Sequence, residues 1–155
     1  MVGFGLLTSC ISVNLSSSDT EKAKALKFDQ PGQPFSEIKT SSSDRAFKSP
    51  LTGTTIAYFS ACGPKADVSL NLISQDVLSS FDRVDQQSSQ LIQIDGREGV
   101  DLSVIGMIDG VQTRIRSAAF KKNGCMYTLT YVALPRFYDS EMAFFNQFIS
   151  NFRAP

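Results

Sequence analysis

Three evenly spaced turn dipeptides constrain the fold of this chain more than any other feature. An Asp or Asn followed by Gly recurs every fourteen residues, as Asp95-Gly96, Asp109-Gly110 and Asn123-Gly124. Such pairs favour type I′ hairpin turns, because both central residues must adopt positive φ. The segments between the turns alternate apolar and polar residues, as in 100–104 and 111–116, which is typical of strands. We therefore predict a four-stranded antiparallel meander from residue 89 to residue 134.

The strand at residues 125–134 differs from the others because both of its faces are apolar or aromatic. This pattern predicts a central strand that is covered on both sides. Upstream, residues 54–61 are expected to form another strand and residues 45–48 a shorter one. Residues 26–29 are left open as a further edge strand.

Two amphipathic helices are expected to frame the meander. Residues 67–81 and 138–152 each carry apolar side chains at spacings of three and four, which places them on one helix face. The predicted buried stripes are Leu70, Ile73, Val77 and Phe81, and then Met142, Phe145, Phe148, Ile149 and Phe152. Core packing explains these phenylalanines better than a ligand site does. The candidate N-caps are Asp67 or Ser69 and Asp139 or Ser140.

This order of elements, with a closing helix that runs from Phe144 to Phe152, resembles the PsbP-like α/β/α sandwich. The resemblance covers roughly residues 26–153. It implies an α+β domain in which an antiparallel β-meander sheet is flanked by helices. The resemblance also implies a role in binding or assembly rather than catalysis, although a fold by itself does not define a function.

A second resemblance lies at the N-terminus, where Leu7-Thr8-Ser9-Cys10 is similar to the lipidation box of bacterial lipoproteins. It implies that residues 1–9 are a truncated signal segment and that the sulfur of Cys10 carries a lipid. Residues 10–25 are then a polar tether, and residues 26–155 are the PsbP-like domain. The alternative is that the first ten residues form an ordinary N-terminal strand.

The lipoprotein resemblance also implies a location. Asp after the lipidated cysteine tends to retain such proteins at the inner membrane, whereas this chain has Ile11. We therefore expect the periplasmic face of the outer membrane, with the lipid at the N-terminus as the membrane contact. An envelope protein or a small ligand is the expected partner.

Cys62 and Cys125 remain as a pair once Cys10 is assigned to the lipid. A pair of cysteines in an oxidising compartment favours a disulfide. The alternative is two buried free thiols at strand ends.

Composition excludes several classes of function. The chain contains no histidine, which rules out a Ser-His-Asp site, a Cys-His site and a zinc site that uses histidine. Fifteen basic residues balance fifteen acidic ones, so the net charge does not favour nucleic acid as a partner. We expect no cofactor, no metal site and no catalytic residue.

Two charged clusters are candidates for a site. Arg114 and Arg116 lie on the same side of one strand and are candidates for binding an anion or a partner; the alternative is cross-strand pairing of the arginines with Asp101. The second cluster gathers around one turn and consists of Asp95, Arg97, Glu98 and Asp101. We expect this cluster to be a solvated hairpin end rather than an acid–base or cation site.

These observations predict a non-catalytic, lipid-anchored binding or accessory module of the cell envelope. One alternative is a carboxylate-dependent envelope hydrolase, which needs two acidic residues that face each other in a deep cleft. The other is a cytosolic interaction protein, if Met1 is the true start and Cys62 and Cys125 are free thiols.

Overall fold

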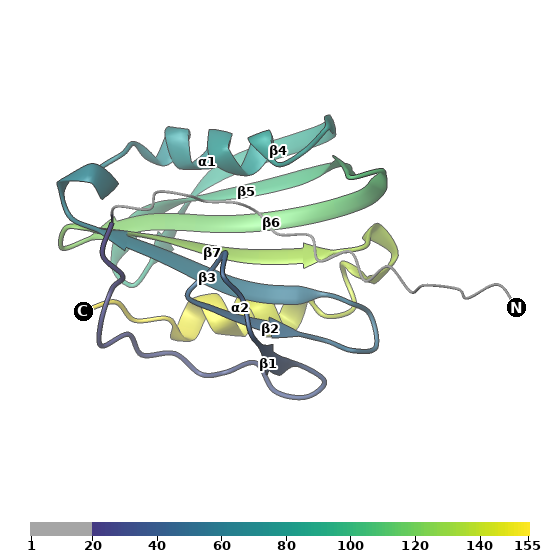
Figure 1. Cartoon of the computed structure of the whole chain (residues 1–155), viewed down its shortest axis with the longest axis horizontal. Helices are drawn as coiled ribbons and strands as arrows, with labels where there is room; N and C mark the ends of the chain where they lie inside the picture. Colours follow the sequence, from purple (N-terminus) through teal and green to yellow (C-terminus); the bar gives the residue numbers. More distant parts are fainter. Residues whose placement is uncertain (1–19) are drawn as a thin grey trace, which may run out of the picture.

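Seven strands form one antiparallel sheet in residues 20–155, which are the residues described by this computed structural model (Figure 1). The strands follow the order β1-β2-β3-β7-β6-β5-β4 across the sheet. Their bounds are β1 Ser36–Ile38, β2 Arg45–Lys48, β3 Thr55–Cys62, β4 Arg83–Ile94, β5 Arg97–Ile108, β6 Val111–Lys122 and β7 Cys125–Ala133. The predicted meander is confirmed as β4 to β7, and β7 joins it to the upstream strands by pairing with β3.

The Asx-Gly pairs form the tight turns that their composition predicts. Asp95, Asp109 and Asn123 have φ values of 50°, 47° and 51°, and a glycine with positive φ follows each of them. Each turn has two residues and joins strands that pair directly on either side of it. Because this turn type matches the twist of the flanking strands, it sets the register of the whole meander.

One helix covers each face of the sheet, which gives an α/β/α sandwich. Helix α1 (Leu70–Ser79) packs on β5 and β6, and α2 (Met142–Asn151) packs on the opposite face along β7 (Figure 1). Short 3₁₀ helices precede them, η1 (Pro64–Ala66) before α1 and η2 (Pro135–Phe137) before α2. The order and layers are those of an α+β, PsbP-like domain.

The helix starts follow the sequence in only one of the two cases. Ser69 caps α1 as predicted, because its Oγ accepts a hydrogen bond from the Leu72 amide at 3.1 Å. The predicted caps of α2, Asp139 and Ser140, are wrong, since α2 begins at Met142 and both residues lie in the preceding turn. The N-cap position is Glu141, and the hydroxyl of Ser140 donates to the Phe137 carbonyl of η2.

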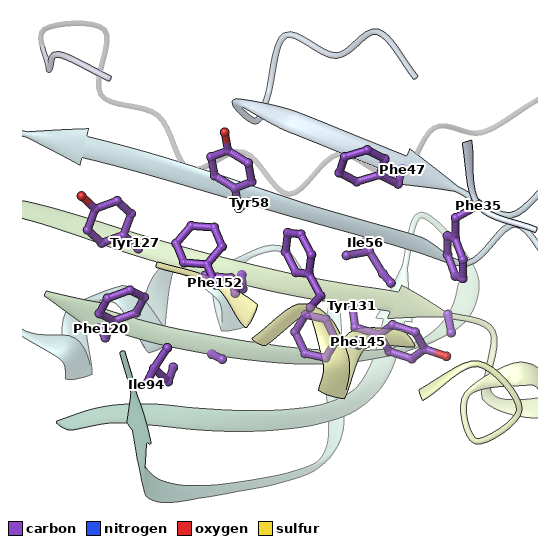
Figure 2. Close-up of a cluster of buried hydrophobic side chains, with 14 of the residues drawn as sticks. Phe35, Phe47, Ile56, Tyr58, Ile94, Phe120, Tyr127, Tyr131, Phe145 and Phe152 are labelled. Carbon is purple, nitrogen blue, oxygen red and sulfur yellow. The ribbon is translucent and has the colours of Figure 1, made fainter. Parts of the chain in front are cut away.

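The largest core cluster lies between the sheet and α2 (Figure 2). Phe152 is fully buried at its centre. Five aromatic rings surround Phe152 at centroid distances of 5.4 to 6.1 Å, namely Phe28, Tyr58, Phe120, Tyr127 and Phe148. The predicted apolar stripe of the last helix is therefore core, as expected. The stripe of α1 is core as well, with Ile73, Val77 and Phe81 buried on the other face.

Three parts of the sheet differ from the prediction. Strand β1 was not predicted; its three residues lie at the sheet edge with little burial, so no hydrophobic alternation marks it. Strand β4 begins at Arg83 rather than at residue 89. Its first half is exposed on both faces, so no alternation of apolar and polar residues marks it in the sequence. Residues 26–29 form no strand, and only Lys27 bridges to Arg153.

The chain contacts the sheet before residue 26. The Cys62 amide donates to the Glu21 carbonyl at 2.8 Å, and the Ala23 amide donates to Ser60 Oγ at 2.9 Å. Lys22 Nζ lies 3.7 Å from the centre of the Phe59 ring. The last residues of the predicted tether thus lie against β3. Residues 1–19, and Cys10 with them, lie outside the described residues, and the division into signal segment, tether and domain stays a prediction.

A disulfide joins Cys62 to Cys125. The two cysteines pair at the end of the β3–β7 ladder, where the strands bring their Cα atoms to 4.0 Å. None of the helices in residues 20–155 is long and apolar enough to cross a membrane.

Candidate binding groove

A groove with a volume of about 480 Å³ lies on the sheet face opposite α2. It extends over β2, β3, β7 and the start of β6, while α1 covers β5 and β6 on the same face. The side chains of β3 alternate between the two faces, so Ile56 and Tyr58 enter the core beneath α2, whereas Thr55, Ala57 and Phe59 line the groove. The loop of residues 39–43 borders one side of the groove.

Hydroxyl and apolar groups alternate along the floor of the groove. The hydroxyl-bearing residues come from three neighbouring strands and are Thr55, Thr113, Thr128 and Thr130. Ala57, Phe59 and Val132 provide apolar surface between them. A mixed surface of this kind suits a ligand that has both apolar groups and hydrogen-bonding groups.

The Thr128 hydroxyl at the floor of the groove differs from its neighbours in its hydrogen bonding. Thr128 is fully buried, and among residues 20–155 its Oγ1 has no hydrogen-bond partner. Thr113, by contrast, donates its hydroxyl to the Val111 carbonyl at 3.0 Å. A buried hydroxyl without a partner costs free energy, but Thr128 lies beneath the groove surface, so a ligand reaches this hydroxyl only if the side chains around it move.

Two lysines add positive charge at one side of the groove. Lys48 lies on β2, paired in register with Thr55 of β3, and Lys39 follows β1. Both side chains line the groove. Their ammonium groups favour an anionic group at this side of a bound molecule.

Arg116 is placed elsewhere, on the face beneath α2. Its guanidinium binds the carboxylate of Asp101, with Nη2 2.7 Å from Oδ2 and Nε 3.0 Å from Oδ1. A further nitrogen donates to Asn146 of α2. The structure therefore shows the cross-strand pair that was the alternative for this arginine. The hydrogen bond to Asp101 raises the pKa of Arg116 and outweighs the opposite effect of its burial.

Arg114 lies two residues away on the same face of β6. Its guanidinium carbon is 3.7 Å from the centre of the Tyr138 ring, which is a cation–π contact. Anion or partner binding by Arg114 and Arg116 stays a prediction, and the Arg116 charge is already balanced by Asp101.

The acidic cluster at the β4–β5 turn separates in space. Asp95 accepts hydrogen bonds from Lys122 Nζ at 2.9 Å and from the Ala154 amide at 2.8 Å. Burial alone would raise the pKa of Asp95, but these two hydrogen bonds and the charges of Lys122 and Arg153 lower it overall. Asp95 and Asp101 are thus mostly buried, with 10% and 6% of their side chains exposed, and the expectation of a fully solvated cluster is wrong for both. Each is held by its own cation, while Arg97 and Glu98 are exposed.

The groove itself was missed at the sequence level. Its signal was present in the threonines that alternate with aromatic and aliphatic residues in Tyr127-Thr128-Leu129-Thr130-Tyr131. In an antiparallel sheet such alternation places both hydroxyls on one face. The two threonines belong to the central strand, but only the tertiary structure shows that both are buried at the floor of a groove that α1 does not cover.

The layers and strand order define the class of domain as a PsbP-like sandwich, and solved structures share this fold. LpqN of Mycobacterium tuberculosis, a protein involved in cell envelope biogenesis, is 13% identical over 89% of this chain and 88% of its own, with a TM-score of 0.64. The cyanobacterial PsbP (CyanoP) of Synechocystis is also 13% identical, over 97% of this chain and 100% of its own, with a TM-score of 0.57.

A third structure, from Bacteroides thetaiotaomicron, is 10% identical over 78% of this chain and 42% of its own, with a TM-score of 0.51. At these identities the likeness concerns the fold alone. No protein-family model and no curated protein matches the sequence.

Proposed function

We propose that this chain is a lipid-anchored binding module of the bacterial cell envelope, which holds a small amphiphilic ligand in the groove over β2, β3 and β7. The open groove carries this proposal, because threonine hydroxyls from three neighbouring strands line it. Apolar side chains beside these hydroxyls suit the body of the ligand, and Lys39 and Lys48 suit an anionic group.

Two observations support a location in the envelope. The Cys62–Cys125 disulfide is typical of oxidising compartments and unusual in the cytosol. LpqN, which has a similar fold, is involved in cell envelope biogenesis. Lipidation of Cys10 would place the groove at a membrane surface, where it has an accessory rather than catalytic role.

A fluorescent amphiphilic anion tests the groove. Anilinonaphthalene sulfonate has aromatic rings and one sulfonate, and we expect it to bind the full chain saturably with one site per molecule. The variant Ala57→Leu places a larger side chain on the groove floor and should weaken binding roughly tenfold, or about 1.4 kcal/mol. Thr130→Val, which removes a hydroxyl at nearly constant volume, should weaken it less.

Leu72→Gln is the matched control, because Leu72 is an exposed apolar residue of α1 outside the groove. Binding should be unchanged in this variant. Equal affinity of Ala57→Leu and the unmodified protein would contradict the assignment of the groove.

The anchor is tested separately by detergent phase partitioning in a bacterial host, with a complete signal peptide in front of Cys10. The unmodified chain should enter the detergent phase and gain the mass of a lipid. Cys10→Ser should remain in the aqueous phase, because serine has no sulfur to carry the lipid. A Cys10→Ser protein that still partitions with detergent would rule the anchor out without affecting the groove.

A further inference from the structure

Strand β4 forms one edge of the sheet and is exposed along most of its length. It pairs with β5 on one side, and its side chains are exposed from Arg83 to Leu91. From Gln86 to Ile94 the sequence contains no charged residue, proline or glycine. The edges of natural sheets are usually protected by charged residues or proline, by bulges or by short strands. The bulge near Val84 affects only the start of β4.

The turn after β4 determines which backbone groups point away from β5. Asp95 and Gly96 have positive φ and form the turn, so Ile94 and Arg97 are the hydrogen-bonded pair that closes it. Hydrogen-bonded and non-hydrogen-bonded pairs alternate along an antiparallel ladder. The amides and carbonyls that point outward therefore belong to Gln87, Ser89, Leu91 and Gln93.

We propose that this edge pairs with a second copy of the chain, through two antiparallel β4 strands related by a twofold axis at Ser89. In this register Ser89 lies opposite Ser89 of the second copy, and Gln87 lies opposite Leu91. Each such pair exchanges two hydrogen bonds, so three pairs contribute about six. The side chain of Leu91, which is 67% exposed, gains cover from the second copy.

Charge favours the second copy as the occupant. The residues from Gln86 to Ile92 are uncharged, so twofold pairing about Ser89 places no charge opposite a like charge. Arg83 and Asp85 bind each other within one copy, with Nε 2.6 Å from Oδ1. The chain as a whole has a formal net charge of zero, so two copies do not repel each other.

The other edge of the sheet explains why the assembly closes at two copies. Strand β1 has only three residues, which is too short to pair along β4 of another copy. Edge-to-edge growth through β1 is therefore disfavoured, and β4 pairing with itself gives a closed twofold dimer. The sheet then continues through both copies, with β1 at each outer edge.

Sedimentation velocity over about a hundredfold range of concentration, up to about 1 mM, tests the dimer, because small interfaces associate weakly. The unmodified protein should shift from monomer to dimer. Ser89→Lys and Ser89→Asp should each abolish the shift, since each places like charges opposite each other at the twofold axis. An equimolar mixture of the two variants should restore the dimer, because opposite charges then meet there.

Ser88→Lys is the matched control, since its side chain lies on the other face of β4 and opposite Gln90 of the second copy. It should dimerise within about twofold of the unmodified protein. Hydrogen exchange provides a readout without substitutions: the amides of Gln87, Ser89 and Leu91 should become protected as concentration rises. A monomer at all concentrations, a dimer that survives Ser89→Lys, or a mixture that stays monomeric would overturn the proposal.

Discussion

Replacing Phe152 by alanine is expected to lower the free energy of unfolding by about 3–5 kcal/mol. Phe152 is fully buried and lies at the centre of the aromatic cluster, with rings from the N-terminal segment, β3, β6, β7 and α2 around it. The substitution therefore removes the contacts by which these elements meet. Because a domain of this size is stable by only about 5–15 kcal/mol, much of its stability is lost.

Urea unfolding followed by circular dichroism measures this change. Phe144→Ala is the matched control, since Phe144 lies in α2, whose C-cap is Phe152, is partly buried and has its ring centroid 5.2 Å from that of Phe35. Its expected loss is smaller, about 1 kcal/mol, because less surface leaves the core. Equal losses in the two variants would show that the core is not centred on Phe152.

Reducing the Cys62–Cys125 disulfide is expected to lower the free energy of unfolding by about 4 kcal/mol. The bond links residues that are 63 positions apart, so it restricts the unfolded chain strongly. The reduced protein should still fold, because eight register pairs hold β3 against β7. Urea unfolding with and without a thiol reductant measures the difference.

The double variant Cys62→Ser/Cys125→Ser serves as the control for this experiment. Its stability should equal that of the reduced protein and should not respond to reductant. Identical unfolding midpoints for the oxidised and reduced protein would contradict a stabilising disulfide.

The sequence by itself determined the elements whose signals are local. Asp95, Asp109 and Asn123 each precede glycine, and a type I′ turn needs only those two residues, so the meander and its register follow directly. The spacing of Ile73 and Val77, like that of Phe145 and Phe148, defines a buried helix face without reference to the rest of the chain.

Long-range contacts decided what these local signals left open. Whether Arg116 binds an external anion or Asp101 depended on the neighbouring strand, whose Asp101 carboxylate lies 2.7 Å away. The start of α2 depended on a distant turn: Glu141 precedes the helix and accepts hydrogen bonds from Ser49 and Thr52. Such contacts leave no periodicity in the sequence.

The groove and the exposed edge are likewise properties of the tertiary structure. The alternating threonines of β7 determine only that Thr128 and Thr130 share a face. That α1 covers β5 and β6 but leaves those threonines at an open groove depends on where the connection between β3 and β4 crosses the sheet. The polar run of β4 likewise becomes a pairing surface only because the strand order places it at the edge.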